Sequence, residues 1–226
     1  MAERENASYS RNGYKTSDQG GLIDAGSGYR AVVVDTPSSR EFRDLISCRR
    51  DVELAKAFAN AFIQMGVESV ENAREPSLAL WIAALTSYGR AFKSSVRTVK
   101  PNAEIFDTSD SEWHNYLVNL RDKHAAHAVN GYEQAFVLAF ITDSSFARRS
   151  VDRVGHVHVD LFPSEEEVRA VSALSGKLLG DLNSRIRKIR PVISQEVEDM
   201  GLDAVYALPP ALVPIHDPAA VAKRRM

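Results

Sequence analysis

This 226-residue sequence contains only one cysteine. Because Cys48 has no second cysteine to pair with, an intramolecular disulfide framework and a cysteine zinc cluster are both excluded. A strong charge of one sign is also lacking: the net charge is −2, so any site for a polyanion has to be local. The most apolar runs, 78–85 and 135–141, are far shorter than the roughly 20 residues of a membrane-spanning helix. We therefore expect a cytoplasmic protein that does not associate with a membrane.

The remaining composition is that of an ordinary globular protein, with 44% hydrophobic and 26% charged residues. Polarity nevertheless varies along the chain. Residues 1–29 show no sustained apolar period, which predicts a mobile arm. Residues 201–226 contain four prolines and are expected to form an extended tail. One domain over 30–200 should lie between them.

Four segments of this domain have the three- and four-residue apolar spacing of amphipathic helices. Ser-x-x-Glu capping boxes predict helix starts at Ser38, Ser109 and Ser164, and Pro76 suits the first turn of another helix. The last helix should end or kink at Pro191. The apolar positions of the four stripes are Phe42, Leu45, Ile46, Leu54, Phe58, Ala61, Phe62 and Met65; Leu78, Trp81, Leu85, Tyr88 and Phe92; Trp113, Tyr116, Leu117 and Leu120; and Val168, Val171, Leu174, Leu178, Leu182, Ile186 and Ile189.

The periodicity changes from that of helices to that of strands after Tyr132. Residues 136–141 form a short run of aromatic and branched residues, and residues 153–161 alternate between apolar and polar. These patterns predict a hairpin over 135–161, with Val157 on an inward face. The sequence as a whole therefore predicts a mainly α fold with a small β-hairpin before a long C-terminal helix.

Histidines and charged residues are concentrated where the third predicted helix ends. The run reads Arg-Asp-Lys-His-Ala-Ala-His over 121–127 and is followed by an Asn-Gly turn at 130–131. The stripe that reaches Leu120 leads onto His124 and His127, so we expect both histidines to face a cleft or a partner. Arg121 should lie beside His124, three positions further on.

This run, in its helical setting, resembles the HEPN superfamily, and most of all the HEPN-like domains of abortive-infection proteins. The family pattern is an arginine, a polar residue and a histidine after four to six intervening positions. Arg121, Asp122 and His127 match it with five intervening residues, whereas His124 falls outside it. The motif match covers 120–134, and the helical match covers about 38–200.

The resemblance implies a HEPN-like helical bundle and a homodimer whose active cleft forms between two copies. It implies a metal-independent endoribonuclease of phage defence or of a toxin–antitoxin system, with no cofactor. An antitoxin or a nucleotidyltransferase would be its regulatory partner. His127 would accept the proton of the ribose 2′-hydroxyl, Arg121 would stabilise the phosphate, and Asp122 would orient an arginine or the histidine of the second copy.

Three neighbouring residues would bind RNA in this interpretation. Lys123 and His124 would contact backbone phosphates, and Tyr132 is the one aromatic residue assigned to the site. The residues leave open whether His124 or His127 is the base. They also leave open a non-catalytic HEPN-like module that binds a nucleotide or a protein.

Two further interpretations concern the histidines. His124 and His127 could simply complement the dipole at a helix C-terminus, where cations are favourable. Alternatively, His156, His158 and Asp160 share one face of the second predicted strand, and with His124 and His127 they could form a histidine-rich metal site. We expect no metal in the ribonuclease interpretation.

Overall fold

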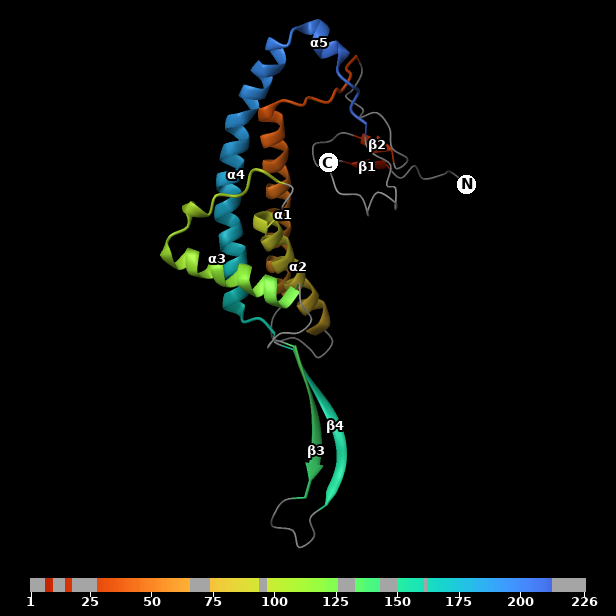
Figure 1. Cartoon of the computed structure of the whole chain (residues 1–226), viewed down its shortest axis with the longest axis vertical. Helices are drawn as coiled ribbons and strands as arrows, with labels where there is room; N and C mark the ends of the chain where they lie inside the picture. Colours follow the sequence, from red (N-terminus) through yellow and green to blue (C-terminus); the bar gives the residue numbers. More distant parts are fainter. Residues whose placement is uncertain are drawn as a thin grey trace, which may run out of the picture. The chain divides into compact units, whose positions relative to one another are not determined.

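The structure is a computed structural model that describes residues 7–9, 15–17, 28–65, 74–93, 97–125, 133–142, 150–160 and 162–212. At 7–9, 15–17, 74, 124–125, 133–135 and 158–160 it describes the backbone only. The chain divides into two compact units, one of Met1–Arg43 with Arg187–Met226 and the other of Asp44–Ile186. The predicted fold class is confirmed: the chain is mainly helical, with a β-hairpin before the long helix α4 (Figure 1).

Four longer helices carry the fold. They are α1 (Pro37–Met65), α2 (Arg74–Lys93), α3 (Thr108–Leu120) and α4 (Glu165–Asp199). A short 3-10 turn, η1 (Ala103–Ile105), precedes α3. Among the described helices, none is both long and apolar enough to cross a membrane.

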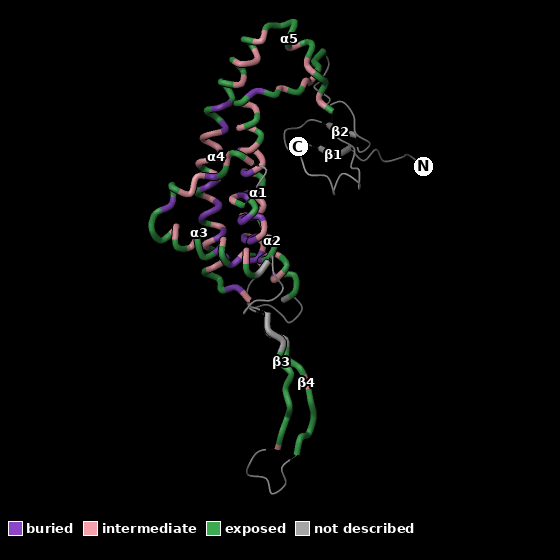
Figure 2. Tube along the Cα trace, viewed as in Figure 1, coloured by how far each residue is buried: buried purple, intermediate pink, exposed green. Residues whose placement is uncertain are grey.

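The core of the larger unit lies along helices α1, α2 and α4, where buried positions recur (Figure 2). On α2 and α4 they include the predicted residues Trp81, Leu85 and Tyr88, and Val168 through Ile186. On α1 the predicted stripe is confirmed at Leu45 and Phe62 but is wrong between them. The buried positions there are Leu45, Cys48, Val52, Ala55, Ala59 and Phe62, a strict three-four repeat.

The reason for this difference is the size of the residues at the helix contact. The prediction followed large side chains such as Leu54 and Phe58, which are only half-buried. Ala55 and Ala59 are fully buried instead. Small residues on the inward line allow neighbouring helices to approach closely, and the larger residues then pack along the flanks.

Only one of the three predicted capping boxes is present as expected. At the start of α4, the backbone N–H of Ser164 donates to Glu167 Oε2 (2.6 Å), and the N–H of Glu167 donates to Ser164 Oγ (3.2 Å). Helix α3 is capped by Asp107, which accepts a hydrogen bond from the Asp110 N–H (2.8 Å), and not by Ser109. Helix α4 continues through Pro191, so the prediction that it ends there is wrong; the alternative, a kink, is not tested.

Helix α1 begins at Pro37, one residue before its predicted start at Ser38. Thr36 and Ser39 form a reciprocal cap, in which the Ser39 N–H donates to Thr36 Oγ1 (3.1 Å) and the Thr36 N–H donates to Ser39 Oγ (2.7 Å). The hydroxyl of Ser38, the predicted cap, donates to Glu196 Oε1 (2.6 Å) instead. Hydrogen bonds from Ser38 and Thr36 lower the pKa of Glu196.

The smaller unit contains elements that the sequence did not predict. Strands β1 (Ala7–Tyr9) and β2 (Lys15–Ser17) pair within the expected arm, and helix α5 (Leu202–Ala207) lies within the expected extended tail. After α5 the backbone is extended, and Val33 N–H donates to the carbonyl oxygen of Pro209 (2.9 Å).

The predicted hairpin is present. Strand β3 (Glu133–Ile141) pairs antiparallel with β4 (Val151–Asp160), with Leu138 opposite Gly155 and a register shift between Phe140 and Ile141. The inward position expected for Val157 is not found, because this side chain is 41% exposed.

Candidate functional site

The charged run begins in a wide helical turn directly after α3. Residues Arg121–Ala125 form a π-helical turn, η2, and the Arg121 N–H donates to the carbonyl oxygens of Leu117 and Val118. A π turn contains more residues than an α turn, so the apolar stripe of α3 does not continue through it with helical spacing. π turns occur frequently at functional sites.

Arg121 is fixed by its stem on helix α2. A Cβ added to Gly89 would lie 2.9 Å from both Cγ and Cδ of Arg121, so the absence of a side chain at Gly89 makes room for the arginine. The Arg121 side chain is only 27% exposed. Its Nε is buried and has no hydrogen-bond partner among the described residues. The stem is therefore held by packing against α2.

Asp122 pairs with two cations, one from α2 and one from the motif itself. Its Oδ2 accepts a hydrogen bond from Lys93 Nζ (2.7 Å), and its Oδ1 accepts one from Arg121 Nη1 (3.1 Å). The Lys93 hydrogen bond, with the Arg121 contact behind it, lowers the pKa of Asp122 below its usual range. The carboxylate is thus ionised at neutral pH and orients both cations.

A second carboxylate, on α1, pairs with Arg90, which lies about one helical turn before Lys93 on α2. Asp51 of α1 is buried and accepts hydrogen bonds from Arg90 Nε (2.8 Å) and Arg97 Nη2 (2.6 Å). Cys48 is fully buried beside this cluster, and burial raises the pKa of its thiol.

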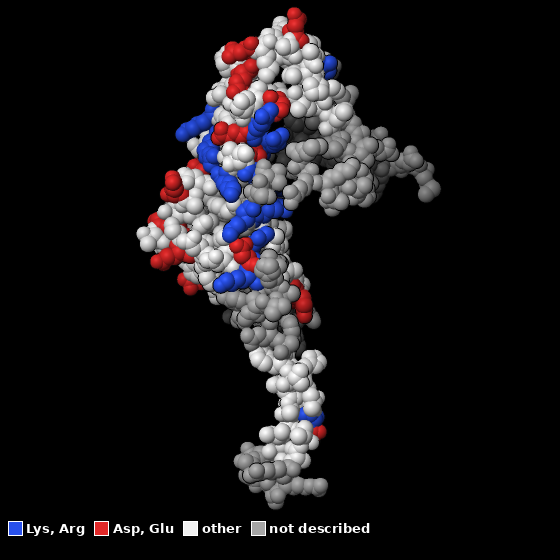
Figure 3. Space-filling view, viewed as in Figure 1, with Lys and Arg blue, Asp and Glu red and all other residues white. Residues whose placement is uncertain are grey.

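The C-terminal turn of α2 therefore concentrates positive charge. Arg90 and Lys93 lie in that turn, and each pairs with a carboxylate that also holds an arginine. Asp51 and Asp122 each pair with two cations, and the helix C-terminus itself favours positive charge. On the face drawn in Figure 3, Lys and Arg side chains gather along the helices with acidic side chains among them.

The other predicted site residues are only partly described. Lys123 is exposed on η2, and His124 is placed there by its backbone alone. His127 and Tyr132 lie outside the described residues. His156 is exposed on β4, where His158 and Asp160 are described by backbone only. Within the described part of the chain, no group of three or more His, Cys, Asp or Glu side chains is arranged to hold a metal ion.

Sequence reasoning missed His114, the histidine on the inner side of α3. Its Nδ1 lies 2.9 Å from the Tyr88 hydroxyl, and its ring packs against Phe92 and Phe106 at centroid distances of 4.5 and 5.4 Å. Burial lowers the pKa of His114 and raises that of Tyr88, so both groups are neutral at pH 7. The spacing from His114 to the buried Leu117 was the available signal for this position.

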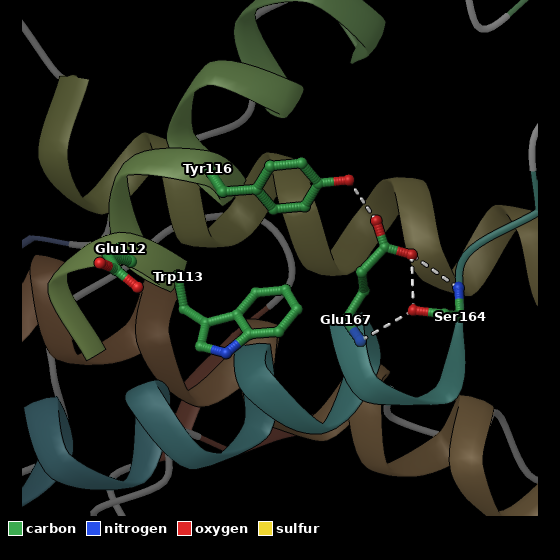
Figure 4. Close-up of a pocket in the computed structure, with 5 residues that line it drawn as sticks. All are labelled: Glu112, Trp113, Tyr116, Ser164 and Glu167. Atoms are coloured by element: carbon green, nitrogen blue, oxygen red, sulfur yellow. Dashed lines mark hydrogen bonds between the residues drawn. The ribbon is translucent and has the colours of Figure 1, made fainter. Parts of the chain in front are cut away.

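The outer side of α3 forms an open pocket of about 470 Å³ against the start of α4 (Figure 4). Tyr116 was predicted to be buried but is 37% exposed, and Trp113 is half-buried. The Tyr116 hydroxyl donates to Glu167 Oε1, so the acid that caps α4 also orients the phenol. The pocket is lined by Glu112, Trp113, Tyr116, Ser164 and Glu167.

Comparison of the chain with models of protein families, with curated proteins and with solved structures finds no match.

Proposed function

We propose that this chain is a HEPN-like, metal-independent endoribonuclease that acts in phage defence or in a toxin–antitoxin system. The observation that carries the proposal is the contact of Arg121 and Lys93 with Asp122 beside the π turn. This contact orients a guanidinium within the same run of sequence as His127, the histidine of the motif.

The chemistry requires a base for the ribose 2′-hydroxyl and a cation for the phosphate that becomes pentacoordinate. Arg121 has a stem fixed against Gly89 and a planar guanidinium, the side-chain group that suits binding of a phosphate. Asp122 orients that guanidinium. His127 is the proposed base, since an imidazole with the ordinary pKa of about 6.5 is partly neutral at cellular pH.

The positive charge at the end of α2 would hold the RNA backbone near this site. Arg90, Lys93 and Arg97 supply cations within a few residues of one another, and phosphate contacts position a nucleic acid without reading its sequence. One copy supplies one base and one phosphate-binding arginine. In the proposed homodimer the motif is doubled, so the cleft would contain two of each.

The test is cleavage of total cellular RNA by the purified full chain in excess EDTA. We expect the wild type to cut RNA and to leave 2′,3′-cyclic phosphate ends, and we expect His127→Ala and Arg121→Ala to lose cleavage. Arg169→Ala is the matched control, because Arg169 is also an arginine paired with a carboxylate, Glu165, but lies on α4. Circular dichroism checks that all variants are folded. Cleavage that persists in His127→Ala would overturn the assignment of the base.

A non-catalytic HEPN-like module is the second candidate. The observation that favours it is that Arg121 and Lys93 share one carboxylate, an arrangement that also suits a static nucleotide- or protein-binding site. Such a module would bind RNA or nucleotides by filter binding or calorimetry and would leave RNA intact in both wild type and His127→Ala.

A further inference from the structure

The β3–β4 hairpin exposes large apolar side chains on both of its faces. On one face, Phe136 is 46% and Phe140 is 41% exposed; on the other, Val137 is 80% exposed. Figure 2 shows the described positions of both strands as exposed along most of their length. Soluble monomers rarely leave such a contiguous apolar surface uncovered, and a two-stranded hairpin is at best marginally stable in water. The hairpin therefore requires a further layer or further strands.

The outer edge of β3 is suited to accept another strand. The described sheet has only two strands, so the edge of β3 opposite to β4 pairs with no described strand. Natural edge strands are usually protected from pairing by charged residues or proline. Strand β3 has neither from Gln134 to Ile141, whereas β4 carries Asp152, Arg153 and Asp160.

The sequence of β3 is self-complementary about Leu138. In an antiparallel pair of identical strands centred there, Leu138 faces its own copy, and Phe136 faces Phe140 of the second copy. Val137 would face Ala139, so every central pair is apolar. Alternation places Phe136, Leu138 and Phe140 on one face of the sheet, which would bring four phenylalanine rings from two copies together.

Strand β4 already supports this arrangement of the aromatic face. The Phe140 ring lies against Gly155, where an added Cβ would be 3.1 Å from Cε2 of the ring. The Arg153 guanidinium stacks 4.6 Å from the centroid of the same ring. The Phe140 ring thus lies over β4 between Gly155 and Arg153, and the partly charged β4 is suited to remain at the outside.

We propose that β3 pairs antiparallel with β3 of a second copy of this chain about Leu138, which forms a four-stranded sheet in the order β4-β3-β3-β4. The two-fold axis passes between the two Leu138 residues, so the same surface serves both copies. This inference names a surface for the homodimer of the proposed function, but it is argued from the hairpin alone, and the assembly is measured without RNA, separately from cleavage.

The first test is the mass of the full chain in solution by light scattering after size exclusion, over a range of concentrations. We expect the wild type to have twice the 25.0 kDa mass of one chain. Leu138→Lys places two ammonium groups opposite each other at the centre and should yield monomers. Val154→Lys is the matched control on the outer strand and should remain dimeric, with circular dichroism confirming that both variants are folded.

The second test traps the central pair. Directly opposite residues have Cβ atoms about 5 Å apart, so Leu138→Cys should form a disulfide between copies under mild oxidation, and Val154→Cys should not. The native Cys48 is buried and gives little background. A monomeric wild type, a dimer that survives in Leu138→Lys, or equal crosslinking of both cysteine variants overturns the proposal. A monomer that instead binds an unrelated protein through the hairpin overturns it as well.

Discussion

Arg121 lies across Gly89: the Cγ and Cδ of the arginine are each 2.9 Å from the position that a Cβ on Gly89 would take. Glycine within a helix costs about 1 kcal/mol relative to alanine, so this position gives up helix stability where the arginine stem crosses. The contact connects α2 to the π turn and fixes the position of the Arg121 guanidinium.

We therefore expect Gly89→Ala to displace Arg121 without unfolding the protein. The gain in helix propensity, about 1 kcal/mol, should offset much of the cost of moving the arginine stem, so the free energy of unfolding changes little. Misplacement of a positioned group by about 1 Å can cost on the order of 100-fold in rate, and we expect RNA cleavage to fall by at least about tenfold. Initial rates on a fixed RNA substrate, with urea denaturation of the same samples, measure both effects.

Gly180→Ala is the control for this substitution. Gly180 is also in a helix, but an added Cβ there meets nothing within 4 Å. The Gly180→Ala substitution should raise the free energy of unfolding by about 0.5–1 kcal/mol and leave RNA cleavage unchanged. If both alanine variants cut RNA at the wild-type rate, Arg121 is not held in place by Gly89.

Among the described residues, Asp51 is the one buried carboxylate. Its side chain is 3% exposed and holds Arg97, itself 13% exposed, together with the half-exposed Arg90. Asp51→Asn leaves a buried arginine without its counter-charge, and we expect a loss of about 3 kcal/mol in the free energy of unfolding. Asp35→Asn breaks an exposed pair with Arg40 and should cost less than about 1 kcal/mol. Urea denaturation measures the free energy of unfolding of both variants. Equal losses in Asp51→Asn and Asp35→Asn would show that burial does not strengthen the Asp51 ion pairs.

The sequence predicts the class of fold because apolar spacing is a property of each segment on its own. The helix starts were less accurate, since Thr36-Pro37 and Asp107 offer capping groups close to the predicted Ser38 and Ser109. Sequence alone does not determine which of two neighbouring caps is used. That choice depends on contacts made later, such as the hydrogen bond from Ser38 to Glu196.

The candidate site was predicted in part. The neighbouring positions of Arg121 and Asp122 indicated a charged cluster, and the structure adds Lys93 and Gly89 from another helix. These additions depend on how α2 packs beside the π turn, which no local pattern contains. The π turn was also missed, because the prediction extended a regular α-helix through the run.

The two competing caps of α3 can be separated by substitution. Asp107→Ala should lower the free energy of unfolding by about 1 kcal/mol, because the Asp110 N–H loses its acceptor. Asp107→Asn should retain most of the stability, since an amide oxygen also accepts this bond. The exposed Ser109 should tolerate alanine with little change. Thermal denaturation of the three variants measures their order of stability. A larger loss of stability for Ser109→Ala than for Asp107→Ala would restore the capping box predicted from sequence.

His114 should make stability depend on pH in the range near neutrality. Burial holds the pKa of His114 below its ordinary value of about 6.5 in the folded state, whereas the unfolded chain binds the proton at the ordinary value. The contribution of the neutral imidazole is therefore fully present above about pH 7. It is lost as the pH falls below about 6.5, by at most about 1.4 kcal/mol per pH unit, until the folded pKa is reached.

The measurement is the free energy of unfolding from urea denaturation at pH 7.5 and at pH 5.5. His114→Gln keeps an acceptor for the Tyr88 hydroxyl but does not titrate, so its stability should change less between the two pH values. Tyr88→Phe should keep the full pH dependence, because burial rather than the tyrosine lowers the pKa of His114. If the free energy of unfolding changes equally with pH in wild type and His114→Gln, the pKa of His114 is not lowered in the folded protein.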